Sequence, residues 1–281
     1  IDPLALRPTL EVKSIEALYG AGQFNGSSGY EEAAVQGFVA GVNAALKLLG
    51  REPMILKRSE SYIGTLIDDL VTKGTEEPYR MMTSRSEYRL LLRQDNADRR
   101  LTPIGYKLGL VPEERMQAVA EKYAAVEAEI YRLEHTGIPG SRELNRLLTE
   151  RGSAAVTDGA RLIDLLRRPQ MTYDELMTFD PHAPALPKAV REQVEISVKY
   201  EGYIRRQLSQ VEEFEKLEQH ALPADADYVS IQGLRLEARE KLNAVRPLNL
   251  GQASRISGVS PADMGALMIY LEKRGGKNER N

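Results

Sequence analysis

A glycine-rich stretch near the start of the chain, followed by a run of small residues, is the feature that most limits the fold. Residues 21–29 (Ala-Gly-Gln-Phe-Asn-Gly-Ser-Ser-Gly) follow a short apolar run at 17–19 and precede an expected helix over about 29–49, which Gly50 should end. The first turn of such a helix has free N–H groups and a partial positive charge, which suit an anionic or electron-rich group. The pattern is typical of a dinucleotide-binding domain, but little sequence precedes it. We therefore expect the tail of an α/β domain followed by a mainly α remainder, as in a part of a longer protein.

The spacing of the glycines argues against a pyrophosphate-binding fingerprint. Gly20, Gly22 and Gly26 nearly match that pattern, but the third glycine comes one residue late and no suitable βαβ unit follows. A loop that closes over the far end of a flavin fits better, with backbone N–H groups near residues 29–31 facing the ring. A glycine-rich turn without a ligand fits the pattern about equally well.

Composition excludes several classes of site. The chain has no Cys, and His135, His182 and His220 are far apart in sequence, so neither disulfides nor a metal site are expected. No apolar run approaches the roughly 20 residues that span a bilayer. The net charge of −3 means that any contact with nucleic acid must come from a local patch.

Helical periodicity dominates the rest of the chain. Helices are expected at residues 112–135, 141–150, 159–168, 172–178, 188–220, 236–245, 251–257 and 261–274, with a disordered tail after Lys273. The sequence predicts three segments: residues 1–57 as the remnant of the α/β domain, 58–200 as a helical domain, and 201–281 as a helical subdomain.

A basic segment lies between Lys73 and Lys107, where eight basic residues face five acidic ones. The four-residue spacing of Arg85, Arg89 and Arg93 predicts a shared face, and the interleaved Tyr79 and Tyr88 could stack on bases. Arginines and aromatics together suit recognition of a folded RNA. A solvated face with internal ion pairs is the alternative, and composition alone favours it.

Residues 250–261, followed by an amphipathic helix, resemble a helix-turn-helix. Basic residues come late in the second helix, so a protein-interaction module is the better interpretation, with plain core packing also open. The acidic pairs Glu31-Glu32 and Asp68-Asp69 diverge by about 100° on a helix and do not form an acid–base dyad. We expect no catalytic residue in this chain.

Four blocks of sequence carry a resemblance to a known family: residues 21–37, 61–90, 95–102 and 246–259. They occur in order over nearly the whole chain. They resemble the tRNA uridine-5-carboxymethylaminomethyl modification enzymes, the MnmG or GidA family.

The resemblance implies a flavoprotein with FAD and NADH sites. Such an enzyme works in the cytoplasm, as a homodimer, with the GTPase partner MnmE and a folate one-carbon donor, and builds an aminomethyl-type group at C5 of the wobble uridine of tRNA. Carried over by residue, Gln23 contacts FAD while Gly22, Asn25 and Gly26 shape the loop. Lys73, Arg80, Arg85 and Arg89 contribute to the tRNA surface, and helices from about Tyr203 onward dock the GTPase.

The resemblance also implies that the FAD site is incomplete in this chain, so the chain alone should be inactive. An autonomous helical adaptor, which binds protein or nucleic acid through residues 250–273, is the alternative hypothesis.

Overall fold

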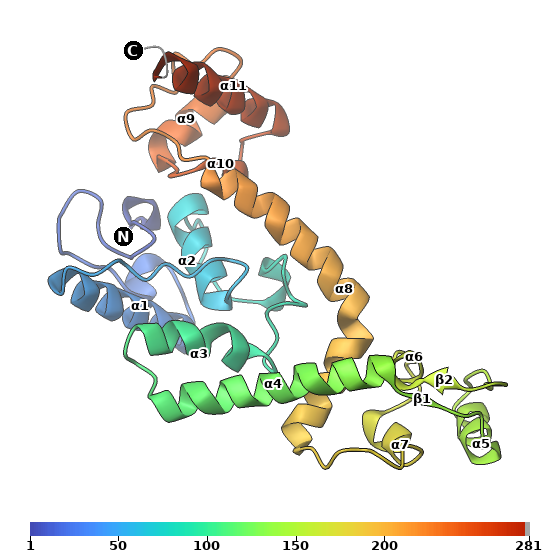
Figure 1. Cartoon of the computed structure of the whole chain (residues 1–281). Helices are drawn as coiled ribbons and strands as arrows, with labels where there is room; N and C mark the ends of the chain where they lie inside the picture. Colours follow the sequence, from blue (N-terminus) through green and yellow to red (C-terminus); the bar gives the residue numbers. More distant parts are fainter. Residues whose placement is uncertain (279–281) are drawn as a thin grey trace. The chain divides into compact units, whose positions relative to one another are not determined.

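The computed structural model describes residues 1–278 and is mainly helical (Figure 1). Its elements are α1 (Tyr30–Leu48), α2 (Tyr62–Lys73), α3 (Ala97–Lys107), α4 (Glu113–His135), β1 (Gly137–Ile138), α5 (Arg142–Glu150), β2 (Ala160–Arg161), α6 (Leu162–Leu166), α7 (Tyr173–Met177), α8 (Lys188–Gln219), α9 (Leu236–Val245), α10 (Leu250–Arg255) and α11 (Pro261–Asn278). Contacts divide the chain into two units, residues 1–92 with 208–281 and residues 93–207.

In the first unit, residues 1–29 form loops and short 3-10 turns that lead into α1. The apolar run at residues 17–19 does not form a strand, because Tyr19 makes only an isolated antiparallel bridge to Glu11. α1 buries Gln36, Val39 and Leu46 on one side. A Cβ added at Gly37 or Gly41 would meet no atom within 4 Å, so these two glycines are not required by close packing.

α2 is buried around most of its circumference, including Leu66, Leu70 and Asp69. Ser61 caps the helix, because its hydroxyl accepts the Gly64 N–H at 2.9 Å. A carboxylate on a helix that is buried on most sides needs a cationic or hydrogen-bonding partner close by, because a buried charge without one is costly. That requirement determines the site described below.

The bundle of α9, α10 and α11 has its own apolar core within the first unit, with Leu222, Tyr228, Leu242, Leu250 and Leu267 among its buried residues. Leu4 packs against this core, and Lys13 Nζ donates to the Val245 carbonyl at 3.0 Å. α11 continues to Asn278, so the disorder expected after Lys273 is wrong for residues 274–278. The rest of that expectation falls on residues 279–281, outside the described part.

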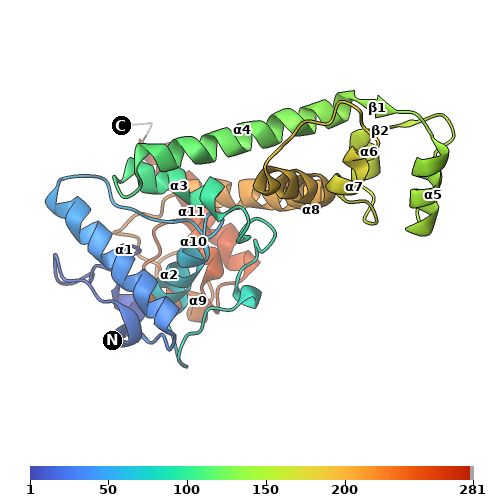
Figure 2. The same cartoon turned by 90° about the horizontal axis from the view of Figure 1, so that it is seen from below.

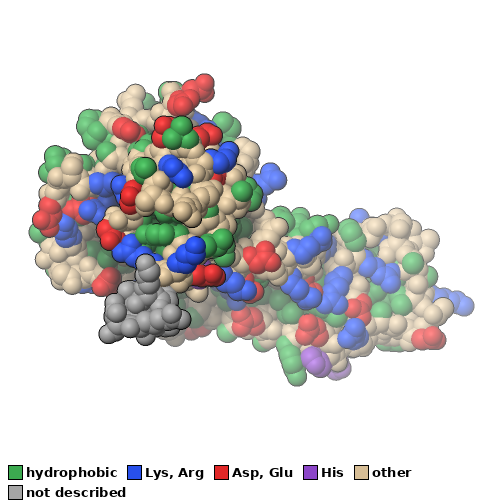
Figure 3. All heavy atoms as spheres, turned by 90° about the horizontal axis from the view of Figure 1, so that it is seen from above, with side chains coloured by type: hydrophobic (Ala, Val, Ile, Leu, Met, Phe, Trp, Pro, Cys, Tyr) green, Lys and Arg blue, Asp and Glu red, His purple; other side chains and the backbone are tan. Residues whose placement is uncertain are grey.

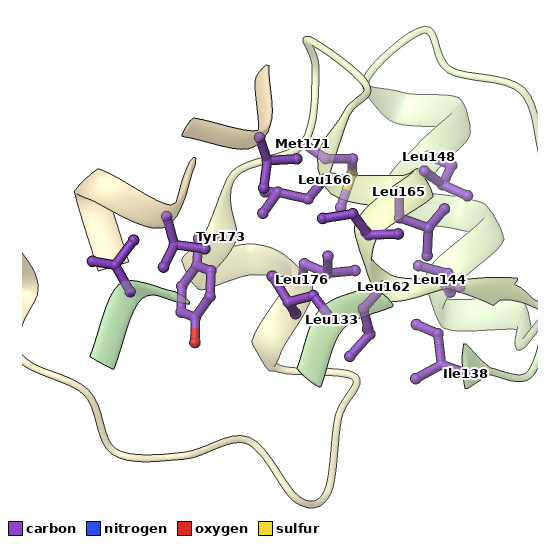
Figure 4. Close-up of a cluster of buried hydrophobic side chains, with 14 of the residues drawn as sticks. Leu133, Ile138, Leu144, Leu148, Leu162, Leu165, Leu166, Met171, Tyr173 and Leu176 are labelled. Atoms are coloured by element: carbon purple, nitrogen blue, oxygen red, sulfur yellow. The ribbon is translucent and has the colours of Figure 1, made fainter. Parts of the chain in front are cut away.

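The second unit is built around α4, which packs beside α3 and against α6 (Figure 2). Its buried cluster gathers leucines from α4, α5, α6 and α7, together with Met171 and Tyr173 (Figure 4). The Tyr173 hydroxyl donates to Glu129 Oε1 at 2.8 Å, which satisfies a buried carboxylate. β1 and β2 form a two-stranded antiparallel sheet with Gly137 opposite Arg161.

The expected helices are confirmed, with ends that differ by a few residues. Thr172 forms the capping box with Glu175, and Ser141 caps α5. By its contacts, the chain forms one unit from residues 1–92 and 208–281. The three segments predicted from the sequence, 1–57, 58–200 and 201–281, do not combine the two ends of the chain in this way. Those three segments stay a prediction about the roles of the parts. Within residues 1–278, no helix is both long and apolar enough to cross a membrane.

Candidate functional site

The expected cofactor loop is held from inside by a buried hydrogen-bond network. A short 3-10 helix covers Gly22–Asn25, and Gly22 and Gly26 have φ values of +81° and +80°. Gln36 Oε1 accepts from the Gly22 N–H at 3.1 Å and from Asn25 Nδ2 at 2.9 Å, while Gln36 Nε2 donates to Ser27 Oγ at 2.7 Å. The network fixes the loop on α1.

This network separates the roles of the four predicted cofactor residues. Asn25 is fully buried and faces inward, so it shapes the loop, as do Gly22 and Gly26. Gln23 is exposed, and its side-chain amide has no hydrogen-bond partner within residues 1–278. Of the four, Gln23 is the one whose side chain is free to reach a ligand, and its contact with FAD stays a prediction.

Glu32 occupies the N-terminal end of α1 and was missed by the sequence analysis as a site residue. Its carboxylate folds back so closely over Gly29 that a Cβ there would overlap Oε2. Oε1 accepts the Met81 N–H at 2.7 Å, and this bond keeps the pKa of Glu32 below its usual value against the opposing effect of burial. The N–H groups expected to face a flavin therefore share this helix end with a fixed negative charge.

Tyr79 joins the cofactor loop to the basic segment. Its N–H donates to the Gly26 carbonyl at 2.7 Å, and its carbonyl accepts the Ser28 N–H at 3.0 Å, as a parallel bridge. A Cβ at Gly26 would overlap Thr75 Oγ1, so only glycine allows this close approach. The structure thus brings the predicted cofactor loop and the predicted tRNA segment together, although some fifty residues separate Ser28 from Tyr79.

Three of the four predicted tRNA-binding cations gather around Tyr79. Lys73 Nζ lies 2.7 Å from Asp69 Oδ1, and the Arg85 guanidinium lies 4.3 Å from the centre of the Tyr79 ring. Arg85 Nε also donates to the Arg80 carbonyl at 2.8 Å. Arg80 is 57% exposed and lies 3.7 Å from Glu32.

Arg89 is exposed and has no ion-pair or hydrogen-bond partner in the part of the chain that the structure describes. The shared face predicted for Arg85, Arg89 and Arg93 does not form, because residues 86–92 fold as turns rather than as a helix or strand. Arg93 instead pairs with Asp95 at 3.0 Å.

Neither Tyr79 nor Tyr88 is available to stack on a base, as each is about 5% exposed or less. The Tyr79 hydroxyl donates to Asp69 Oδ2 at 2.7 Å. Burial and the neighbouring carboxylate raise the pKa of Tyr79 well above its usual value, so it stays a donor.

A buried ion network supports this region. Arg58, only 6% exposed, forms a forked pair with Glu87 and also reaches Asp68 at 3.2 Å and Asp69 at 2.7 Å. Arg255 from α10 pairs with Asp68 from the other side at 2.7 Å. Burial alone would raise the pKa of Asp69, but Arg58, Lys73 and Tyr79 outweigh it and lower that pKa. The signal in the sequence was an acidic pair inside an otherwise apolar helix, α2.

A cavity of about 410 Å³ opens beside Arg80 and the N-terminal ends of α1 and α2. Its volume lies in the range of small-ligand clefts, roughly 300–1,000 Å³. It is lined by Glu31, Glu32, Val35, Tyr62, Ile63, Leu66, Arg80 and Met81.

The wider surface carries both signs of charge. On the face shown in Figure 3, Lys and Arg side chains are interspersed with Asp and Glu. Within residues 1–278, no group of three or more His, Asp or Glu side chains is placed to hold a metal ion.

Comparison with known proteins decides the family. Models of the MnmG/GidA C-terminal helical domain and of the MnmG/GidA C-terminal helical bundle match residues 113–208 and 210–281. A third model, glucose inhibited division protein A, matches residues 1–52. The chain belongs to the MnmG/GidA family.

Relatives from two bacteria extend this match along the chain. The tRNA uridine 5-carboxymethylaminomethyl modification enzyme MnmG of Clostridium kluyveri is 57% identical over 274 residues, which are 98% of this chain and 44% of the relative. MnmG of Caldicellulosiruptor saccharolyticus is 55% identical over 279 residues, 99% of this chain and 45% of the relative. The chain thus spans less than half the length of these MnmG proteins.

A solved structure of Aquifex aeolicus GidA superimposes on 96% of this chain with a TM-score of 0.83 and 46% identity, and the match covers 42% of that protein. The mainly α fold, with a piece of the GidA domain at residues 1–52, is confirmed.

Proposed function

We propose that this chain supplies the C-terminal part of a flavin-dependent enzyme that, with a GTPase partner, installs (carboxymethyl)aminomethyl groups at C5 of the wobble uridine in tRNA. The observation that carries the proposal is the link through Tyr79. It ties the loop around Gln23 to the segment of Arg80 and Arg85 by backbone hydrogen bonds. A cofactor edge and an RNA backbone would therefore be held by one rigid piece of structure.

In this proposal Gln23 contacts FAD, and Gly22, Asn25 and Gly26 hold the loop. Arg80 and Arg89 make direct phosphate contacts, since both are exposed. Lys73 and Arg85 contribute to the same surface but are partly engaged with Asp69 and Tyr79. NADH and the folate one-carbon donor would bind to parts of the enzyme outside this chain, and we propose a cytoplasmic homodimer.

The bundle of α9–α11 is proposed to dock the GTPase MnmE. It exposes large apolar side chains, including Val229 at 61%, Leu236 at 72% and Ile269 at 53%. Exposed apolar side chains are common singly, so the support lies in their presence on one small bundle. Family membership favours this reading over the autonomous adaptor.

A chimera tests the enzymatic proposal. This chain would replace the corresponding part of Clostridium kluyveri MnmG, in a bacterium that lacks its own enzyme, and wobble uridines would be analysed by mass spectrometry of digested tRNA. We expect modification to be restored, to be lowered at least severalfold by Arg80→Ala, and to be unchanged by Glu77→Ala on the exposed loop nearby. A folded, flavin-loaded chimera that leaves the uridines unmodified would contradict the proposal.

A further inference from the structure

We propose that a second cavity, between residues 6–13 and the α9–α11 bundle, binds a small organic anion in which a carboxylate or phosphate is carried on an apolar or aromatic body. This cavity includes no residue of the loop around Gln23 and shares no lining residue with the cavity beside Arg80. The inference goes beyond the proposed function and does not depend on it.

The cavity has the size and the walls of a small-ligand site. It lies entirely within the first unit, and its volume of about 350 Å³ falls in the range of clefts that hold small molecules. Its walls are largely apolar, with Leu6, Val71 and Leu222 among the buried side chains. An apolar or aromatic body would therefore lose its contact with water against these walls, which favours binding.

The charged side chains that line the cavity are all cationic: Arg7, Lys13 and Arg246. None of them has an ion-pair partner within residues 1–278. The side-chain hydrogen bonds of Lys13 and Arg246 there go only to backbone carbonyls. Three cations without a counter-charge leave a positive potential in the cavity, and an anion accepts stronger hydrogen bonds from them than a neutral group does.

Carboxylates near this cavity do not neutralise the cations. Glu11 and Glu16 both pair with a lysine of α1, in a neighbouring cavity that Arg7 and Lys13 also line. Burial and then Arg7 lower the pKa of Lys13, and the opposing effect of Asp2 does not cancel them. A bound anion would relieve this repulsion between like charges.

Two buried side chains add neutral donors to the three cations. Tyr228 is 1% exposed and lines the cavity, and its hydroxyl is not sealed from solvent yet has no hydrogen-bond partner within residues 1–278. Burial raises the pKa of Tyr228, so the hydroxyl keeps its proton and can donate it. Gln252 stands between this cavity and a smaller one, and its Oε1 accepts the Leu248 N–H at 2.9 Å while Nε2 has no partner within residues 1–278. A ligand oxygen would satisfy such donors.

Arg246 brings a cation next to the free hydroxyl group. Its guanidinium lies 5.4 Å from the centre of the Tyr228 ring. Arg246 ends α9 with φ of +53°, a conformation that glycine or asparagine adopts more readily, so the turn itself does not call for a long cationic side chain. A guanidinium and a hydroxyl side by side are donors that one carboxylate or phosphate accepts from together.

The test is a ligand-observed NMR titration of the full 281-residue chain. Phenyl phosphate and phenylacetate each carry an anion on an aromatic body, whereas benzyl alcohol lacks the charge and inorganic phosphate lacks the apolar body. We expect at least one of the two aromatic anions to bind saturably, roughly tenfold or more tightly than benzyl alcohol and inorganic phosphate. The tighter of the two anions identifies the head group.

Variants connect this binding to the cavity. Arg246→Gln should weaken the aromatic anion roughly tenfold and leave benzyl alcohol unchanged, because it removes a charge-assisted hydrogen bond. Lys241→Gln is the matched control, since it removes an exposed cation of α9 that does not line the cavity, and it should change nothing. Tyr228→Phe should weaken the anion severalfold without lowering thermal stability, because the hydroxyl has no partner in the described chain.

Ala224→Trp should abolish binding, because it fills the cavity from an exposed position of its lining, and thermal unfolding verifies that this variant is folded. Three results would overturn the proposal: no saturable binding of either aromatic anion, equal binding of benzyl alcohol, or anion binding that survives both Arg246→Gln and Ala224→Trp. Each of them would leave the proposed function standing.

Discussion

At the scale of single residues, carboxylates buried beside arginines carry much of the specificity of this fold. Asp69 accepts from Arg58, Lys73 and Tyr79, and Asp263 accepts from Arg235 and Ser260. Removing one partner from such a group leaves a buried charge or donor without compensation, which costs more than the intact pair contributes. These residues therefore report on the fold more sharply than the exposed ion pairs do.

Asp263 allows a pH-dependent test. Burial alone would raise its pKa, but hydrogen bonds from Arg235 and Ser260 outweigh burial and lower the pKa well below the usual value. A lowered folded-state pKa contributes stability that is present above the unfolded value of about 3.9 and is lost as pH falls below it. Asp263→Asn should reduce the free energy of unfolding by roughly 2 kcal/mol at about pH 6, because charged hydrogen bonds are lost. The deficit should shrink as pH falls below about 4.

Urea unfolding followed by circular dichroism measures this effect. Asp225→Asn is the matched control, because Asp225 also pairs with an arginine, Arg274, but is exposed. We expect a much smaller change for the control, because water screens an exposed ion pair. A deficit for Asp263→Asn that stays constant down to about pH 3 would contradict the assigned role of its charge.

At the scale of elements, the turn before α1 depends on glycine for two separable reasons. Gly26 has φ of +80° and lies so close to Thr75 that a Cβ would overlap it. Gly50, which ends α1, has φ of +62° but open space around it. Comparing Gly50 with Gly26 therefore separates the cost of backbone strain, which both share, from the cost of a steric clash, which only Gly26 has.

Gly50→Ala should cost about 1 kcal/mol of stability, the usual left-handed penalty, and leave the loop intact. Gly26→Ala should cost at least about 1 kcal/mol more, because the segment with Tyr79 must move away. Thermal unfolding gives both values, and loss of amide protection at Tyr79 and Ser28 in hydrogen exchange identifies the moved segment. Equal losses of stability for the two variants would show that Thr75 moves away from the new methyl group at no cost.

At the scale of the whole molecule, the two units have separate apolar cores. The core of the second unit draws all its buried residues from positions between Val126 and Val198. The bundle core in the first unit draws its buried residues from Leu222 to Leu267. The helix α8 runs through the boundary between the two units. A continuous helix therefore links the units without merging their apolar cores.

Residues 93–207 should therefore fold when produced alone. We expect a helical circular dichroism spectrum and a cooperative urea transition, which Leu165→Ala lowers by about 2–5 kcal/mol because that side chain is fully buried. Leu110→Ala, on an exposed side chain of the same unit, is the control and should change little. A fragment that shows helix content without a cooperative transition would mean that the unit needs the rest of the chain.

Much of the local structure followed from sequence alone. Periodicity predicted the ends of α4, α8 and α9 to within a few residues, and the capping pair Thr172 and Glu175 predicted the start of α7. The glycine pattern identified a constrained turn before α1, because few other residues tolerate those backbone angles. Caps and periodicity act within one or two turns, so a single sequence determines them.

Tertiary structure alone decided which distant segments meet. Nothing in the spacing of residues 73–93 indicated that Tyr79 would be buried on Asp69, or that Glu32 would hold Met81. Likewise, Arg255 reaches Asp68 across 187 positions of sequence. These pairings depend on the burial of α2 on nearly every side, which forces its carboxylates to find cations wherever the chain provides them. The sequence by itself determined the helices and the constrained turn, while long-range burial and charge pairing decided the site.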